Sequence, residues 1–157
     1  MSEVSIRIKP HHFIDIITTF GAGTLKFEPH PYGHDVHRIA RIVMDDPETE
    51  LVMELGADDI CAPCEHNIDG VCDDTIDTSY RPTAPTSKRE WNLMIDRRWA
   101  ARLGIGQDDV LTARAFCELL LEQAGDITDI YREIPAKMTR ERSRKLMKGI
   151  KKYLGMQ

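Results

Sequence analysis

The stretch VSIRIKPHHFIDIITTFGAG, residues 4–23, contains the patterns that predict how the chain begins to fold. Apolar and polar residues alternate over residues 4–9, which predicts a short strand that ends at Pro10. Apolar residues then recur at helical spacing over residues 13–20, and two glycines follow as a stop signal. The stretch therefore predicts a strand that leads directly into an amphipathic helix.

Most of the other periodic segments also predict helices. They lie at residues 34–47, 88–104, 108–125, 126–135 and 139–155. Ser87 and Glu90 have the spacing of a capping box before the second of these. Residues 50–55 predict a second strand beside the first. The expected fold class is mainly α with a small two-stranded β element (α+β) and a metal-binding cysteine loop.

The 157 residues fit a single domain, and a net charge of −5 conceals two unlike parts. Residues 1–136, the predicted metal-binding domain, are acidic, whereas residues 137–157 predict a basic helix that packs on this domain or on a partner. A homo-oligomer could form through this helix. Nucleic acid is an unfavourable partner because the acidic domain would repel phosphates. No apolar run is long enough for a membrane span, which predicts a soluble, cytoplasmic protein.

The cysteine loop ADDICAPCEHNIDGVCDD, residues 57–74, holds three of the four cysteines. Cys61 and Cys64 form a C-x-x-C pair, and Gly70 permits the reversal that would bring Cys72 towards them. Three crowded thiolates repel one another unless a cation neutralises them. The loop therefore predicts a metal site. Free or disulfide-exchanging thiols are the alternative.

Zinc and an iron–sulfur cluster both remain candidates at this point. Structural zinc takes four protein ligands, so a histidine or Cys117 would have to complete the set. Cys117 lies on the apolar stripe of its predicted helix, together with Leu120, which favours a buried core thiol. Trp91 and Trp99 are likewise expected to be packing residues.

The segments IRIKPHHFIDI and DDICAPCEHNIDGVC together resemble an uncharacterised family of small bacterial and archaeal proteins described as iron–sulfur binders, a domain of unknown function. That family has an Arg-Pro-His-His-Leu-Leu-Cys motif and, later, Asp-Asp-Ile-Cys-x-x-Cys. The resemblance covers about half of the chain and implies a 4Fe–4S cluster held by Cys61, Cys64 and Cys72. Asp15 stands where the family has a cysteine, so the resemblance makes Asp15 the fourth ligand, with a weakly held iron. Zinc in a three-cysteine site is the alternative.

The histidine doublet, His11 and His12, begins the first predicted helix, and one helical face can present His11 with Asp15. We assign both histidines a role in proton transfer, and His11 is the next candidate ligand after Asp15. The alternative is a structural doublet at the strand–helix junction. His66 is a spare ligand inside the cysteine loop. The spacing of His34 and His37 would also let them chelate a metal, but surface histidines on a solvated helix are the favoured interpretation.

Three functions are compatible with these residues. The first is a non-redox enzyme in which an open cluster iron acts on a small molecule. The second is an electron-transfer or redox-sensing module, in which the protein ligates every iron. The third is a zinc-stapled binding protein that uses its basic helix to contact a partner.

Overall fold

The computed structural model describes residues 5–24 and 26–156, so Val4 and Gln157, which belong to predicted segments, lie outside the described residues. The elements are β1 (Ser5–Ile8), α1 (Pro10–Gly21), α2 (Val36–Asp45), β2 (Glu50–Met53), β3 (Asn67–Ile68), β4 (Val71–Cys72), α3 (Lys88–Leu103), β5 (Val110–Thr112), α4 (Ala113–Gln123) and α5 (Ala136–Tyr153). The prediction of a mainly α fold with a small β element is confirmed.

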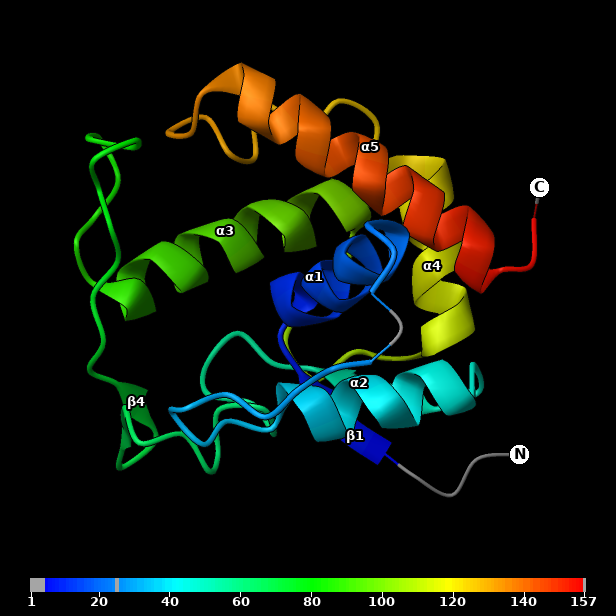
Figure 1. Cartoon of the computed structure of the whole chain (residues 1–157), viewed down its shortest axis with the longest axis horizontal. Coiled ribbons are helices and arrows are strands. Elements are labelled where there is room, and N and C mark those ends of the chain that lie inside the picture. The colour runs from blue at the N-terminus through cyan, green and yellow to red at the C-terminus, as the bar shows by residue number, and fades with distance from the viewer. Residues whose placement is uncertain (1–4, 25, 157) are drawn as a thin grey trace.

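Helix α1 lies at the centre of the molecule, between α2 on one side and α3 and α5 on the other (Figure 1). Pro10 occupies its first turn, where the missing N–H leaves no hydrogen bond unmade. Phe13, Ile14 and Ile17 are fully buried on this helix. The histidine doublet at the start of α1 is half-buried.

The two predicted strands pair as expected, since β1 runs parallel to β2 with Ile6 opposite Leu51. The sheet also has a third strand, because β5 runs antiparallel to β2. The helix prediction for residues 108–125 is wrong over this first part. Thr112 caps α4 instead, its hydroxyl accepting a hydrogen bond from the Ala115 N–H.

The prediction of a helix at residues 126–135 is also wrong, since this segment forms consecutive turns. Asp126 accepts hydrogen bonds from both the backbone N–H and the hydroxyl of Thr128. Arg98 of α3 donates to the Ile130 carbonyl oxygen and makes a two-pronged ion pair with Glu133. The Ile130 carbonyl oxygen is a group that a helix would need for its own hydrogen bonds, and Arg98 takes it.

Helix α5 packs directly against α1 and belongs to the same core, to which it contributes Leu146 and Ile150. A Cβ added to Gly149 would overlap the Ile17 carbonyl oxygen, and one added to Gly21 would overlap that of Lys145. Only glycine permits so close an approach of two backbones. The contact therefore holds the basic helix close against the second half of α1.

Core positions expected from the sequence are buried. Trp99, Cys117 and Leu120 are fully enclosed, and Trp91 is nearly so. Burial, with a smaller contribution from Glu118, raises the pKa of the Cys117 thiol to about 12, which marks it as inert. None of the helices in the described part of the chain combines the length and the apolar character that a membrane span requires.

Candidate metal centre and adjoining cavity

Asp58 is the residue that joins the histidine doublet to the cysteine loop. Its side chain is 0 % exposed. One carboxylate oxygen accepts from His12 Nδ1 and from the Lys9 N–H, both at 2.7 Å, and the other accepts from the Cys61 N–H at 3.0 Å. Burial alone would raise the pKa of Asp58, but the charge and hydrogen bond of His12 hold it well below its ordinary value. Asp58 is therefore an ionised anchor at neutral pH.

Asp96 of α3 holds His11 as Asp58 holds His12. Its side chain is also 0 % exposed, and it accepts hydrogen bonds from the His11 N–H at 2.8 Å and from His11 Nδ1 at 2.8–2.9 Å. Burial lowers the pKa of His11, but the charge and hydrogen bond of Asp96 outweigh it and raise the pKa overall. The ring centroids of His11 and His12 lie 4.4 Å apart. Each ring contacts a different carboxylate.

The cysteine loop reverses twice. The Cys64 N–H donates to the Cys61 carbonyl oxygen at 2.9 Å, which closes the C-x-x-C turn. Asp69 and Gly70 both have positive φ, as a tight hairpin turn requires, and this turn pairs Cys72 with Asn67. The expected reversal at Gly70 is confirmed, and it brings the third cysteine back towards the first two.

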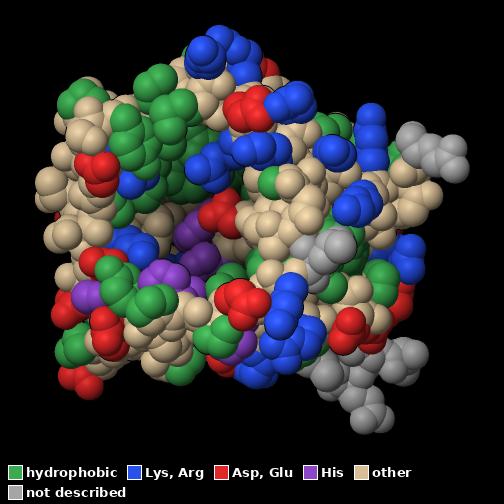
Figure 2. Space-filling model, in the orientation of Figure 1, with side chains coloured by type: hydrophobic (Ala, Val, Ile, Leu, Met, Phe, Trp, Pro, Cys, Tyr) green, Lys and Arg blue, Asp and Glu red, His purple; other side chains and the backbone are tan. Residues whose placement is uncertain are grey.

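All three loop cysteines line one cavity of about 360 Å³, which we call the cysteine pocket. They are half-buried, and none is in a disulfide. The remaining side chains around it that bear on the chemistry are Lys9, His12, Asp15, His34, Asn67, Lys88, Arg89 and Asn92. Figure 2 shows a hollow on this face of the molecule with histidine side chains inside it and charged side chains at its edge.

Two ionisable groups, the Cys61 thiol and the Lys9 ammonium, set the electrostatics of the cysteine pocket. Burial and the neighbouring Asp58 raise the pKa of Cys61 to about 12, so this thiol keeps its proton unless a metal displaces it. Lys9 is only 5 % exposed and lines the same cavity, with no ion-pair partner among the described residues. Its ammonium group would offset the negative charge of any thiolate formed in this cavity.

A compact metal-ligand group exists at one side of the cysteine pocket. The ligand atoms of His12, Asp58 and Cys61 all lie within 4.8 Å of one another, and among the described residues no other trio of such groups does. The sulfurs of Cys61, Cys64 and Cys72 are therefore more widely spread as a set. Tetrahedral zinc, with Zn–S bonds of about 2.3 Å, would need them about 3.8 Å apart.

A second cavity of about 300 Å³ adjoins the cysteine pocket and shares His12, Asp15, Lys88 and Asn92 with it. We call it the cationic cavity. Its other lining residues are His11, Ile76, Arg81, Trp91, Ile95, Tyr131, Ile134 and Arg142. The two histidines of the doublet thus contribute unequally, because His12 faces both cavities and His11 lines the second.

Of the two fourth ligands predicted from the sequence, Asp15 lies beside the cysteines and His11 does not. Asp15 lines the cysteine pocket, but its carboxylate forms an ion pair with Arg142 at 3.1 Å. His11 does not line the cysteine pocket, whereas His12 does. Among the other histidines, His34 lines the cysteine pocket, and burial together with the nearby His30 and His12 lowers its pKa.

The other two sequence candidates lie apart from these ligands. His37 is not among the residues around the cysteine pocket, so the structure does not join it with His34 in one site. His66 Nδ1 is 2.8 Å from Asp73 Oδ1, in an exposed pair on the loop.

Sequence reasoning missed the two carboxylates that hold the doublet. Asp58 could have been noticed because it lies in the Asp-Asp-Ile-Cys run next to Cys61. Its position in the sequence, however, does not indicate that His12 is its partner. The polar Asn92 and Asp96 lie four residues apart on the buried face of α3, near Ile95 and Trp99. Polar residues at core positions of an amphipathic helix could have marked this face as functional.

Comparisons with protein-family models, with curated proteins and with solved structures find no match.

Proposed function

We propose that the chain binds an iron–sulfur cluster of the 4Fe–4S type through Cys61, Cys64 and Cys72. The observation that carries the proposal is the convergence of three free, half-buried cysteines on one cavity. The spread of their sulfurs favours a multi-iron cluster over a single ion, since a cluster holds each thiolate on a different iron.

Two further features of the cysteine pocket support a bound group. Asn67 Oδ1 is buried there with no hydrogen-bond partner among the described residues, although buried polar atoms normally have one. The buried ammonium of Lys9 supplies positive charge beside the thiols. The Lys9 ammonium suits a ligand that carries sulfide and thiolate charge, whereas Asn67 Oδ1, an acceptor, would need a metal ion or a hydrogen-bond donor of the bound group.

His12 is the protein ligand that we assign to the fourth position. Its Nδ1 is held by the buried Asp58, which leaves Nε2 available for a metal. A histidine that ligates a metal commonly bonds a carboxylate with its other nitrogen, as here. Asp15, the fourth ligand expected from the sequence, is engaged by Arg142 and is the less favourable choice.

The adjoining cationic cavity favours an enzyme-like role over simple electron transfer. With His12 on the fourth iron, the protein would ligate every iron, so the cluster would supply an electron donor or acceptor to a small molecule in this chamber. The protein's own part is to orient His12 through Asp58, to hold the cysteine loop, and to offer a second chamber beside it. Such a chamber gives a small molecule a place next to the metal.

A single zinc ion is the second candidate, because His12, Asp58 and Cys61 already lie within 4.8 Å of one another. Against it, both carboxylate oxygens of Asp58 already accept hydrogen bonds from neighbours, so Asp58 behaves as a support for ligands.

Metal and sulfide analysis of anaerobically purified protein, with an absorption spectrum, tests the proposal. We expect about four irons and about four sulfides per chain and a brown colour. A triple change of Cys61, Cys64 and Cys72 to serine should abolish all of these. Cys117→Ala is the matched control and should retain them, because Cys117 lies in the core. Stoichiometric zinc without visible absorption would show that the iron–sulfur proposal is wrong.

A further inference from the structure

The cationic cavity has the opposite charge balance from the chain as a whole. Three cationic side chains, Arg81, Lys88 and Arg142, line it against one carboxylate, Asp15. The chain has 26 acidic and 21 basic residues. Because acidic partners are plentiful, cations gathered around one cavity need a reason to be there.

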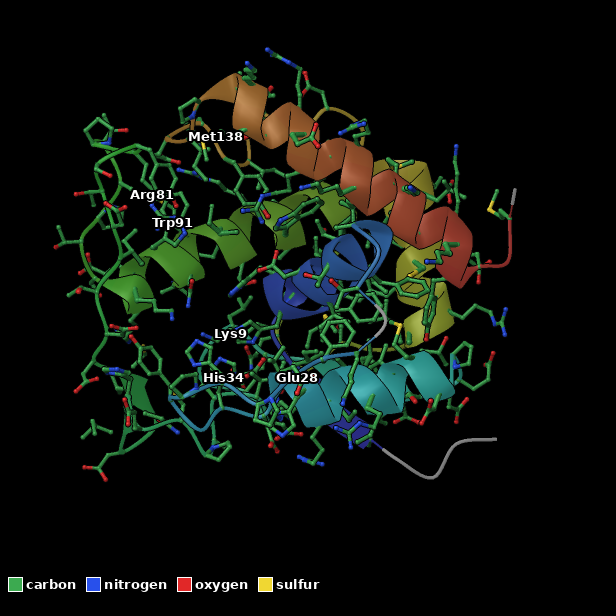
Figure 3. The ribbon with its side chains drawn as sticks, viewed as in Figure 1. Lys9, Glu28, His34, Arg81, Trp91 and Met138 are labelled. Carbon is green, nitrogen blue, oxygen red and sulfur yellow. The ribbon has the colours of Figure 1, made fainter. Side chains whose placement is uncertain are left out.

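Arg81 is the clearest sign of a built site. Its Nε donates to the Asp77 carbonyl oxygen at 2.7 Å, and its guanidinium lies over the rings of Tyr80 and Trp91 at 4.7 and 5.0 Å. Figure 3 shows Arg81 beside Trp91 near the start of α3. This guanidinium is held in place, yet it makes no ion pair with a carboxylate among the described residues, although its charge contributes to lowering the pKa of the nearby Asp77. The other described arginines without an ion pair are exposed, whereas Arg81 is half-buried.

Two more donors face the same space. Asn92 is 9 % exposed and lines both cavities, and its side-chain amide has no hydrogen bond to any described residue. Lys88 contacts Asp74 at 3.4 Å, a long distance that leaves most of its hydrogen-bonding capacity unused. The two residues therefore offer a charged and a neutral donor to one ligand.

We propose that the cationic cavity binds a small organic anion through a carboxylate or phosphate group, with Arg81, Lys88 and Asn92 as its donors. Guanidinium groups recognise both kinds of oxyanion, usually through two parallel hydrogen bonds. A volume of about 300 Å³ suits a small metabolite. Arg142 remains committed to Asp15, which sets one edge of the site.

The site goes beyond the proposed cluster and does not depend on which metal the cysteines hold. Its donors come from α3 and the segment before it, whereas the cysteines lie on a separate loop. The shared wall at His12 places a bound anion next to the cysteine pocket. Resting on the proposed function, the inference also names the class of substrate for that neighbouring centre.

Calorimetric titration of the purified protein with inorganic phosphate and, separately, with malonate at low salt tests the proposal. We expect saturable binding of at least one probe, and the tighter of the two assigns the ligand as a phosphate or a carboxylate. Arg81→Gln should weaken it about tenfold to hundredfold through loss of charged hydrogen bonds. Arg97→Gln is the matched control, because Arg97 is an exposed arginine of α3 outside both cavities.

The absence of saturable binding by either probe would overturn the proposal, as would equal affinities of the Arg81→Gln and Arg97→Gln variants. A Lys88→Gln variant supplies a second test if Arg81→Gln fails to fold, and it should also weaken binding. Titration of the triple cysteine-to-serine variant separates the two proposals. Anion binding that persists there, in protein without metal, supports the anion site whatever becomes of the cluster.

Discussion

His11 and His12 are neighbours in the chain, and both line the cationic cavity, but only His12 also lines the cysteine pocket. His12 is held by Asp58 of the cysteine loop and faces the cysteine pocket. His11 is held by Asp96 of α3 and lines the cationic cavity. The two carboxylates are equally inaccessible to solvent, and each makes contacts of 2.7–2.9 Å with its histidine. The difference lies in which distant segment each carboxylate comes from.

This arrangement shows how a doublet at one helix start can serve two kinds of ligand. The cysteine pocket gathers thiols, a carboxylate-backed imidazole and a buried lysine, which suit a metal. The cationic cavity gathers donors, which suit an anion. A carboxylate that binds the Nδ1 of each ring fixes its orientation. The strongest tests change one carboxylate and leave the other intact.

Exchange of Asp58→Asn should have the largest effect. It removes a buried charge that three groups contact, so we expect a loss of about 3–5 kcal/mol in the free energy of unfolding. Metal content should also fall, because His12 is no longer oriented and the Cys61 N–H loses its acceptor. Urea unfolding and iron analysis of anaerobic protein measure both quantities.

Asp96→Asn is the matched variant for the second chamber. It should destabilise the fold by a similar amount, through the lost pairing with His11, yet leave the metal content of the folded protein unchanged. Equal loss of metal in both variants would contradict the division of the doublet between two chambers.

Glu133→Gln should have an intermediate effect that depends on pH. Arg98 donates two hydrogen bonds to Glu133, at 2.7 and 2.8 Å, and holds the pKa of that carboxyl below its ordinary value of 4.5. The pair fixes the segment that carries Tyr131 and Ile134 to the wall of the cationic cavity. We expect a loss of about 1–3 kcal/mol at pH 7 in urea unfolding.

A folded pKa that lies below the unfolded one stabilises the protein fully above about pH 4.5. This stabilisation is lost as the pH falls through the lower, folded pKa. The difference between wild type and Glu133→Gln should therefore shrink in acid. Glu122→Gln is the control, since Glu122 is exposed on α4, and it should be neutral at each pH. A wild-type advantage that stays constant down to pH 2 would contradict the assignment.

Asp15→Asn should have the smallest effect and should sharpen the distinction between the chambers. Removal of the carboxylate frees Arg142 and leaves the cationic cavity more positive, so affinity for phosphate or malonate should rise severalfold. Iron content should stay at the wild-type level if His12 is the fourth ligand. Loss of one iron per chain would instead support Asp15 as the ligand, as the sequence resemblance implies.

Local patterns predicted much of the fold. Alternation predicted β1, helical spacing and glycine stops predicted α1, and the Ser87 cap of α3 is present, with its hydroxyl accepting from the Glu90 N–H. The secondary-structure predictions are wrong where contacts with distant residues outweigh the local helical pattern. Residues 110–112 extend because β2 offers them backbone partners, and residues 126–135 turn because Arg98 takes a carbonyl oxygen from them.

In the candidate site, too, local features could be predicted from the sequence and long-range contacts could not. The cysteine spacing and the Asp69–Gly70 turn indicated the reversal that brings Cys72 back, since a tight turn depends on adjacent residues. The partners of the doublet gave no such signal, because Asp58 lies 46 residues from His12 and Asp96 lies 85 residues from His11. Spacing along the chain contains no information about pairs so far apart.

By itself, the sequence determined the helices with strong periodicity, the small β element, the cysteine loop and the histidine doublet, because each depends on residues close together in the chain. Only the tertiary structure decided which carboxylate each histidine meets, that Asp15 turns to Arg142 across 127 positions, and that two cavities meet at His12. Those outcomes depend on how α1 packs against α3, α5 and the cysteine loop. Packing brings ionisable groups together at distances that no local pattern sets.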